Sequence, residues 1–251
     1  MLRGKVAWIT GGGSGIGLAG GVELAKAGAH VVISGRSAET LKKAEKEIKA
    51  AGSGEAIALD VSEQQEVAKA AQGILKRHGR VDILVNSAGI NSPKRNFRNV
   101  SVESWDQIVA INLSGTFYCC QAVLPGMRER KDGLIINISS WFGRYWNTLG
   151  GPGYNATKHA VVSLTETVNV EEAANGIRAT CILPGEVATP ILEKRPVPPT
   201  PEVRARMLQA EDLGKTILFI ATLPARACVN EVVISPTWNR LVQGGLEVTK
   251  T

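Results

Sequence analysis

The feature that most constrains the fold is an alternation between short apolar segments and longer amphipathic ones. The short segments have the composition of buried strands, and they cover residues 5–10, 30–35, 55–61, 81–89, 133–140, 176–185 and 230–236. The intervening stretches repeat apolar residues at helical spacing, and they cover 18–28, 37–52, 63–79, 102–127, 154–175 and 202–223. Strands that alternate with helices pair in parallel through right-handed crossovers, so the pattern predicts a mostly parallel, seven-stranded sheet with helices on both faces.

Nothing in the sequence divides this pattern into separate domains. The 251 residues, 44% of them hydrophobic, suit one α/β domain with a large core, and no linker, repeat or low-complexity segment interrupts them. We therefore expect a single doubly wound, Rossmann-like domain over residues 1–251. A proline-rich stretch, RPVPPTP at 195–201, lies in a segment at about 190–207 that we interpret as a substrate lid.

Charge and cysteine content narrow the class of partner. The net charge is +6, but the basic residues are scattered and do not alternate with aromatic ones, so no nucleic-acid partner is expected. The densest cluster, RERKD at 128–132, suits a solvated helix end, with an acidic partner surface as the alternative. The four cysteines form no CxxC pair, which argues against a disulfide framework or a metal site. Without a signal-type or membrane-spanning apolar run, we expect a cytoplasmic protein with no membrane segment.

A glycine-rich loop, TGGGSGIG at 10–17, joins the first strand to the first helix. Such a loop lets the backbone approach a pyrophosphate and leaves N–H groups free at a helix N-terminus, where the dipole favours anions. A literal GxGxxG match at Gly15, Gly17 and Gly20 is a poorer description, because Gly20 falls inside the helix. The alternative is a tight turn without a ligand. The residues expected to hold the nucleotide here are Gly11, Gly13, Ser14, Gly15, Ile16 and Gly17.

The end of the second strand, ISGRS, indicates which dinucleotide is bound. An acidic residue at this point accepts hydrogen bonds from free ribose hydroxyls, whereas an arginine holds a 2′-phosphate. Gly35 occupies the place of the acid, Arg36 follows it, and Ser37 adds a hydroxyl. The segment therefore favours NADP over NAD, unless Arg36 is only a surface residue before a helix.

The stretch GPGYNATKHA at 151–160 places Tyr154 and Lys158 four residues apart. On a helix this spacing brings both side chains to one face. A nearby cation favours the tyrosinate and lowers a tyrosine pKa of about 10, so the two residues can form an acid/base pair. By itself the spacing also fits an ordinary helix surface.

Together these motifs resemble the short-chain dehydrogenase/reductase family, in its shorter branch of about this length, and the resemblance covers nearly the whole chain. The matching residues outside the glycine loop are Asp60 and Val61 of LDV, Asn86, Ala88 and Gly89 of NSAG, Asn112 of INLSG, Ser140 of NISS, Tyr154 and Lys158 of YxxxK, and Pro184, Gly185, Val187 and Thr189 of PGEVATP.

The resemblance implies an NADP(H)-dependent oxidoreductase that interconverts a carbonyl and a secondary alcohol. Tyr154 would be the general acid or base, and Lys158 would activate it and bind the nicotinamide ribose. Ser140 would hold the substrate oxygen, and Asn112 would position a water that connects Lys158 to solvent. The other matching residues would bind the cofactor: Asp60 and Val61 beside the adenine, Asn86, Ala88 and Gly89 along the dinucleotide, and Pro184, Gly185, Val187 and Thr189 along the nicotinamide.

Three departures from the family pattern affect this interpretation. Ser140 lies one residue further from Tyr154 than is commonest, which leaves Ser139 as the alternative serine. The glycine loop lacks a basic residue, so a 2′-phosphate would depend on Arg36. The C-terminal VNEVVISPTWNR resembles members that act on 3-oxo or 3-hydroxy acids.

The loop at 141–152 is rich in aromatic residues, of which Trp141 and Trp146 are expected to wall a substrate pocket, unless they pack on the next helix or a second subunit. Basic residues of the lid segment could attract an acidic substrate: Lys194, Arg195, Arg204 and Arg206. Family resemblance also implies a homo-oligomer, a dimer or tetramer. The competing functions are a non-catalytic dinucleotide sensor or scaffold, and a lyase or epimerase with a transient cofactor.

Overall fold

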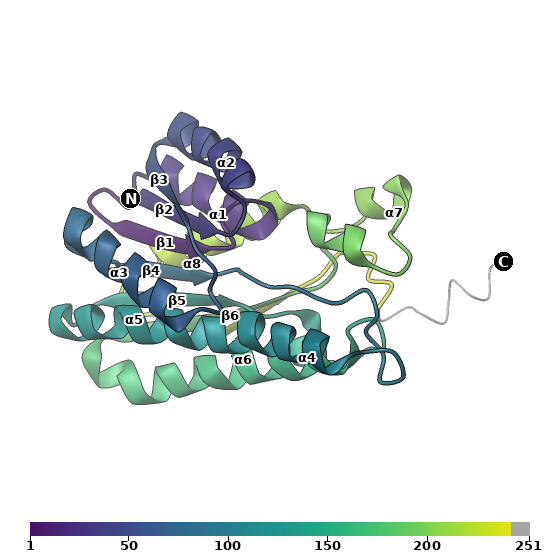
Figure 1. The fold of residues 1–251 in the computed structure, drawn as a ribbon. Coiled ribbons are helices and arrows are strands. Elements are labelled where there is room, and N and C mark those ends of the chain that lie inside the picture. Colours follow the sequence, from purple (N-terminus) through teal and green to yellow (C-terminus); the bar gives the residue numbers. More distant parts are fainter. Residues whose placement is uncertain (242–251) are drawn as a thin grey trace.

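A single parallel sheet runs through the centre of the molecule (Figure 1). In this computed structural model, which describes residues 1–241, the strands have the order β3-β2-β1-β4-β5-β6-β7 and all pair in parallel. The strands are β1 (Val6–Thr10), β2 (His30–Gly35), β3 (Ser53–Ala58), β4 (Ile83–Asn86), β5 (Gly133–Ile138), β6 (Ile177–Pro184) and β7 (Glu231–Ile234). The order reverses between β1 and β4, and a crevice forms at the carboxyl ends of strands where this happens.

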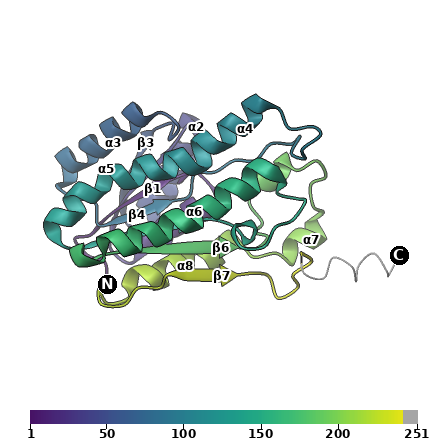
Figure 2. The ribbon, with the colours of Figure 1, turned by 90° about the horizontal axis from the view of Figure 1, so that it is seen from below.

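Helices cover both faces of the sheet (Figures 1 and 2). One face carries α1 (Gly15–Lys26), α2 (Ala38–Ala51) and α8 (Ala210–Thr222). The other carries α3 (Gln64–His78), α5 (Gly115–Arg130) and α6 (Gly151–Glu172), with α4 (Val102–Val109) leading into α5. Short segments complete the fold: a π-helical turn η1 (Ala110–Ser114), the 3₁₀ turns η2 (Trp141–Gly143), η3 (Ala173–Asn175) and η4 (Pro190–Lys194), and α7 (Pro201–Ala205).

The core has two layers because successive strand residues point to opposite faces. In β1, Ala7 and Ile9 pack under α1, α2 and α8, whereas Trp8 packs under α3 and α5. Trp8 is fully buried and donates its indole N–H to the Ser34 hydroxyl over 3.1 Å. This arrangement confirms the predicted doubly wound fold.

The elements differ from the sequence prediction mainly at their ends. The helix expected at 202–223 is split, because Leu208 forms a β-bridge with Val187 between α7 and α8. The helix expected from Tyr154 begins at Gly151, because Pro152 sits in its first turn, where a missing N–H costs no hydrogen bond. The helix expected at 102–127 contains the π turn and continues past Pro125 to Arg130.

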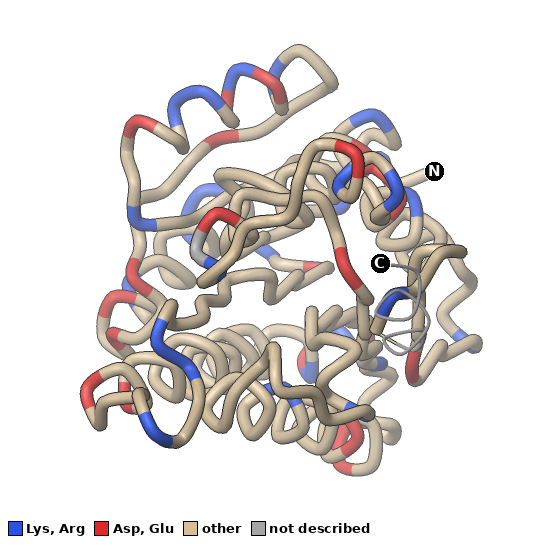
Figure 3. Tube along the Cα trace, turned by 90° about the vertical axis from the view of Figure 1, so that its right-hand side faces the viewer, with Lys and Arg blue, Asp and Glu red and all other residues tan. Residues whose placement is uncertain are grey.

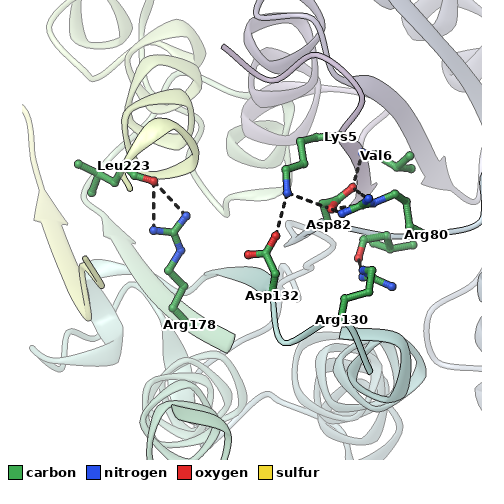
Figure 4. A network of polar contacts seen from close by, with 9 residues as sticks. Lys5, Val6, Arg80, Asp82, Arg130, Asp132, Arg178 and Leu223 are labelled. Atoms are coloured by element: carbon green, nitrogen blue, oxygen red, sulfur yellow. Dashed lines mark hydrogen bonds and ion pairs between the residues drawn. The ribbon is translucent and has the colours of Figure 1, made fainter. Parts of the chain in front are cut away.

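A network of charged residues ties together the amino ends of three strands (Figure 4). Lys5 donates to Asp82 over 3.3 Å and to Asp132 over 2.8 Å. Asp82 is only 4% exposed, and it also accepts from the Val6 backbone N–H over 2.8 Å and from Arg80. These contacts hold β1, β4 and β5 in register at the edge opposite the carboxyl ends.

Basic and acidic residues are interspersed along the trace, and neither sign is confined to one part of it (Figure 3). The continuous helical segment Val102–Arg130 has the length and apolarity of a membrane span, but 44% of its most apolar window is buried inside the fold. Cys119, Val123 and Met127 on this segment pack against the sheet, as expected of a core helix. All four cysteines are free thiols.

Candidate active site

A cavity of about 280 Å³ lies at the carboxyl ends of the central strands. Its walls are the glycine loop before α1, the loop after β4, the ends of β5 and β6, the first turns of α6, and the η4 segment. The predicted site residues that line it are Gly11, Ser14, Gly15, Ile16, Ala88, Gly89, Ser140, Trp141, Tyr154, Lys158, Pro184, Gly185, Val187 and Thr189.

The glycine loop is packed too tightly for side chains at two positions. Gly11 has a φ of +64°, and a Cβ there would lie 2.7 Å from the Ala88 backbone nitrogen. A Cβ on Gly17 would lie 2.5 Å from the carbonyl oxygen of Gly11. At these two glycines the loop has room for backbone but not for a side chain. Gly20 instead lies within α1 against Ile217, so it belongs to the core packing.

The N-terminus of α1 fits an anionic group. Its first turn contains no acidic residue, and Ser14 at the N-cap makes no side-chain capping bond. Ser14, Gly15 and Ile16 all line the cavity. A helix N-terminus in this setting presents free N–H groups and the positive end of the dipole, which is what a dinucleotide pyrophosphate requires.

Arg36 and Asp60 lie outside this cavity, along a second surface depression with the end of β3. The Arg36 guanidinium is 3.9 Å from the Asp60 carboxylate, and about half of the Arg36 side chain is exposed. Ser37 caps α2 by accepting from the Thr40 backbone N–H over 3.2 Å. The adenosine end of a dinucleotide would occupy this depression, while its other end would enter the cavity.

Tyr154 and Lys158 lie on the same face of α6, and both border the cavity. The Lys158 Nζ atom is 5.5 Å from the centre of the Tyr154 ring and donates to the carbonyl oxygen of Ile138 over 2.8 Å. Burial lowers the pKa of Lys158 to about 8. Burial raises the pKa of Tyr154, while a hydrogen bond with Ser140 and the positive charges of Arg195 and Arg95 act in the opposite direction.

The structure distinguishes the two adjacent serines. The Ser139 hydroxyl donates to the carbonyl oxygen of Lys158 over 2.7 Å, so it anchors α6 to the end of β5. The Ser140 hydroxyl instead accepts from the Phe142 backbone N–H over 3.2 Å and borders the cavity, where it acts to lower the pKa of Tyr154. Despite the additional residue in the loop before Tyr154, Ser140 and Tyr154 therefore line the same cavity.

The two predicted asparagines do not line the cavity but support its wall. Asn112 lies in the π turn, and its amide accepts from Ile90 N over 2.8 Å and donates to Ile90 O over 3.0 Å. This places it behind Gly89, where a Cβ would be 3.5 Å from both the Asn112 Oδ1 and Lys158 Nζ atoms. Asn86 donates to the Asn137 side chain over 2.9 Å within the sheet.

Four other predicted residues also lie outside the cavity, among them Gly17, which packs against Gly11. Gly13 packs against Thr40, where a Cβ would lie 3.2 Å from its methyl group. Val61 is buried against Gly115 in α5. Trp146 is 78% exposed and does not line the cavity, whereas Trp141 does. Trp141 stacks on Tyr145 with ring centres 4.5 Å apart.

Two charged cavity residues, Arg95 and Glu186, were not predicted from the sequence, whereas Phe142 lies in the aromatic loop that was expected to wall a substrate pocket. Phe142 meets the Tyr154 ring edge-on, with centres 6.3 Å apart. Glu186 is 5% exposed and binds Arg195 and Arg240. A charged residue inside the otherwise small and apolar PGEVATP segment is a signal that could have identified Glu186. Arg95 follows β4 by a few residues, and its nearness to that carboxyl end was the available signal.

The lid arginines have separate environments. Arg195 lines the cavity. Arg204 pairs with Glu193 over 2.7 Å, and the Arg206 guanidinium lies 5.0 Å from the centre of the Trp238 ring. Only Arg195 of these three borders the cavity.

Comparison with known proteins identifies the family of this chain. A family model for short chain dehydrogenase matches residues 5–198. The 3-oxoacyl-(acyl-carrier-protein) reductase of Thermotoga maritima is 33% identical over 238 residues, which span 92% of this chain and 96% of the relative. An uncharacterized oxidoreductase of Staphylococcus epidermidis is 32% identical over 94% of this chain and 98% of its own length.

Solved structures share the whole fold. A metagenomic short-chain oxidoreductase in complex with NADP superposes with a TM-score of 0.82 at 32% identity, covering 94% of this chain and 98% of that one. A 3-ketoacyl-(acyl-carrier-protein) reductase of Brucella melitensis, complexed with NADH, has a TM-score of 0.84 at 31% identity with the same coverage. On the matched residues and the shared fold, this chain belongs to the short-chain dehydrogenase/reductase family of oxidoreductases.

Proposed function

We propose that the protein is an NADP(H)-dependent oxidoreductase that interconverts a ketone or aldehyde and a secondary alcohol. The observation that carries the proposal is the meeting of Ser140, Tyr154 and Lys158 at one end of a cavity whose other end is the glycine loop at the N-terminus of α1.

A bound nicotinamide dinucleotide supplies or accepts the hydride. The Tyr154 phenol donates the proton to the developing alkoxide in reduction and removes it in oxidation. Ser140, which borders the same cavity as that phenol, orients the carbonyl oxygen. The Lys158 ammonium favours the tyrosinate through its charge, and it would hold the nicotinamide ribose when the cofactor is bound. Asn112 holds the loop after β4 through Ile90 and contacts α6 through Thr157, and it would position a water that connects Lys158 to solvent.

The preference for NADP rests on Arg36. Its half-exposed guanidinium at the end of β2 suits a 2′-phosphate, and Asp60, on the same depression, suits the adenine. Arg36→Asp should shift the ratio of kcat/KM values for NADPH and NADH toward NADH. An unchanged ratio would show that Arg36 does not bind the 2′-phosphate.

Two features support a 3-oxo or 3-hydroxy acid as substrate. The C-terminal VNEVVISPTWNR segment resembles family members of that type, and one relative is named a 3-oxoacyl-(acyl-carrier-protein) reductase. The segment at 190–207 would act as the lid, since its base is closed by the bridge between Val187 and Leu208 while Ile191 and Leu192 border the cavity.

The test is NADPH-linked reduction and NADP⁺-linked oxidation across a panel of ketones, aldehydes, 3-oxo acids and secondary alcohols. Turnover that requires NADP(H) is expected, and an absence of turnover with every compound would favour the second candidate, a dinucleotide-binding sensor. Assembly into a dimer or tetramer and a cytoplasmic location remain predictions.

A further inference from the structure

Two arginines from separate parts of the chain border the reaction end of the cavity. Arg95 lies in the loop after β4, and Arg195 follows η4 in the lid segment. We propose that this pair binds a carboxylate on the substrate, so that the enzyme selects carbonyl and hydroxy acids over neutral analogues. The inference rests on the proposed function, and it attributes the choice of substrate class to these two residues.

Both guanidinium groups act on the same part of the cavity as Tyr154. Arg95, Arg195 and Tyr154 line the same cavity, and the charges of both arginines act to lower the pKa of Tyr154 against the larger effect of burial. Arg95 and Arg195 also interact with each other: burial, and then the charge of Arg195, lowers the pKa of Arg95. Two like charges that face one cavity repel, and an anion bound between them would relieve that repulsion.

Protein contacts fix where both groups point. Arg95 donates its Nε–H to the carbonyl oxygen of Ser92 over 2.8 Å and its Nη1 to that of Leu149 over 3.1 Å. The Arg195 side chain is 13% exposed, and its Nη1 donates to Glu186 over 2.6 Å. A guanidinium held in this way loses little entropy when it binds a ligand, which increases its contribution to affinity.

The carboxylate that holds Arg195 is itself shared. Glu186 also accepts from Arg240 through Nε over 2.6 Å and through Nη2 over 2.8 Å. Glu186 therefore holds Arg195 from one side and Arg240 from the other, and it fixes the position of Arg195 at this wall of the cavity. The neighbouring Leu241 lines the cavity, so the C-terminal segment forms part of the same wall.

A substrate carboxylate explains this pair better than the phosphates of a cofactor. The site for a pyrophosphate is the N-terminus of α1, at Ser14 to Ile16. Arg95 and Arg195 instead act on Tyr154, where the carbonyl must lie to receive its proton. A carboxylate also matches the planar guanidinium, which can donate two parallel hydrogen bonds to it.

The experiment compares acids with their neutral methyl esters, beginning with acetoacetate and methyl acetoacetate. The measured quantity is the ratio of kcat/KM for the acid to that for the ester, with NADPH as reductant. In the wild type we expect a ratio well above one. In Arg95→Ala and in Arg195→Ala we expect this ratio to fall by about 10-fold to 100-fold, as for loss of a hydrogen-bonded charge. Arg195→Lys should recover part of it.

Arg204→Ala is the matched control. It removes the same charge from the same lid segment, but Arg204 is paired with Glu193 and does not border the cavity. Its acid-to-ester ratio should equal that of the wild type. An equal fall in Arg204→Ala would mean that the ratio reports only the general charge of the lid, and would overturn the assignment.

A second measurement covers variants that lose turnover altogether. Binding of butanoate, an unreactive carboxylate, to the NADP⁺-loaded enzyme should be weaker in Arg95→Ala and Arg195→Ala than in the wild type. Equal butanoate affinity would overturn the proposal. If the variants keep the butanoate affinity of the wild type but lose affinity for NADPH, the arginines bind the cofactor and not the substrate, which also overturns the proposal.

The two hypotheses fail in different ways. If ketones and esters are reduced but the acid-to-ester ratio is near one and insensitive to both arginines, the oxidoreductase function holds and the carboxylate site is refuted. If the wild type reduces nothing yet binds butanoate through both arginines, the anion site holds and the proposed function is refuted.

Discussion

Lys158 provides a prediction whose magnitude follows from its burial. The pKa of Lys158 falls from 10.5 to about 8 in the folded protein, with burial as the main cause. The unfolded chain therefore holds this proton more tightly than the folded one. At pH 7 a pKa difference of this size lowers the free energy of unfolding by about 3 kcal/mol.

The direction of the pH effect follows from the same comparison. Below pH 8 both states are protonated and the full cost of the buried charge is present. Between about pH 8 and pH 10.5 the folded protein has lost the proton while the unfolded chain keeps it, so the free energy of unfolding rises with pH. From pH 7.5 to pH 9.5 the expected gain from Lys158 is about 2 kcal/mol.

The assay is urea unfolding of the cofactor-free protein at pH 7.5, 8.5 and 9.5, for the wild type and for Lys158→Met. Only the change with pH is compared, because Lys158→Met also loses the hydrogen bond to the carbonyl oxygen of Ile138. The difference between the two proteins removes the titration of other groups, such as the cysteine thiols. Lys43→Met, which replaces an exposed lysine on α2, is the control.

We expect the wild type to gain about 2 kcal/mol relative to Lys158→Met over this range. The Lys43→Met control should follow the wild type. If the wild type and Lys158→Met change in parallel, the burial of a charged Lys158 is refuted, and with it the basis for its effect on Tyr154.

Two further predictions concern the loop and the sheet. Gly17→Ala would place a Cβ 2.5 Å from the Gly11 carbonyl oxygen, so the loop must shift; NADPH affinity measured by fluorescence should fall, and an unchanged affinity would contradict the proposed cradle. Asp82→Asn removes a buried carboxylate from Lys5, Arg80 and the Val6 N–H, and should lower the free energy of unfolding in urea by about 2–3 kcal/mol. These groups lower the pKa of Asp82, so its contribution is present at neutral pH and is lost as the pH falls through the folded value; equal stability of Asp82→Asn and the wild type at pH 7 would refute it.

The order of the elements could be predicted from sequence because each strand and helix carries its own pattern. The seven strands and the two-sided helix packing follow from apolar periodicity and from glycine at turns. The ends of the helices and strands were predicted less accurately than their order, because the ends depend on tertiary contacts. Leu208 leaves the helical pattern because its backbone pairs with Val187, and no local signal marks that pairing.

The candidate site divides in a similar way. Residues that follow a strand, such as Ser140, could be placed because parallel strands bring their carboxyl ends together. Arg95 and Glu186 were missed although each had a weak local signal, because their roles depend on tertiary contacts, such as those of Glu186 with Arg195 and Arg240. Trp146 was expected to wall the pocket but is exposed. An aromatic composition alone does not reveal which rings turn toward a cavity and which remain exposed.

The most direct test of the account is the comparison of the wild type with Tyr154→Phe, using the best substrate of the panel. Phenylalanine keeps the ring against Phe142 but has no proton to donate. We predict that kcat falls by about 100-fold or more while NADPH binds with unchanged affinity. A Tyr154→Phe enzyme with the kcat of the wild type would contradict the assignment of Tyr154 as the proton donor, and with it the proposed site.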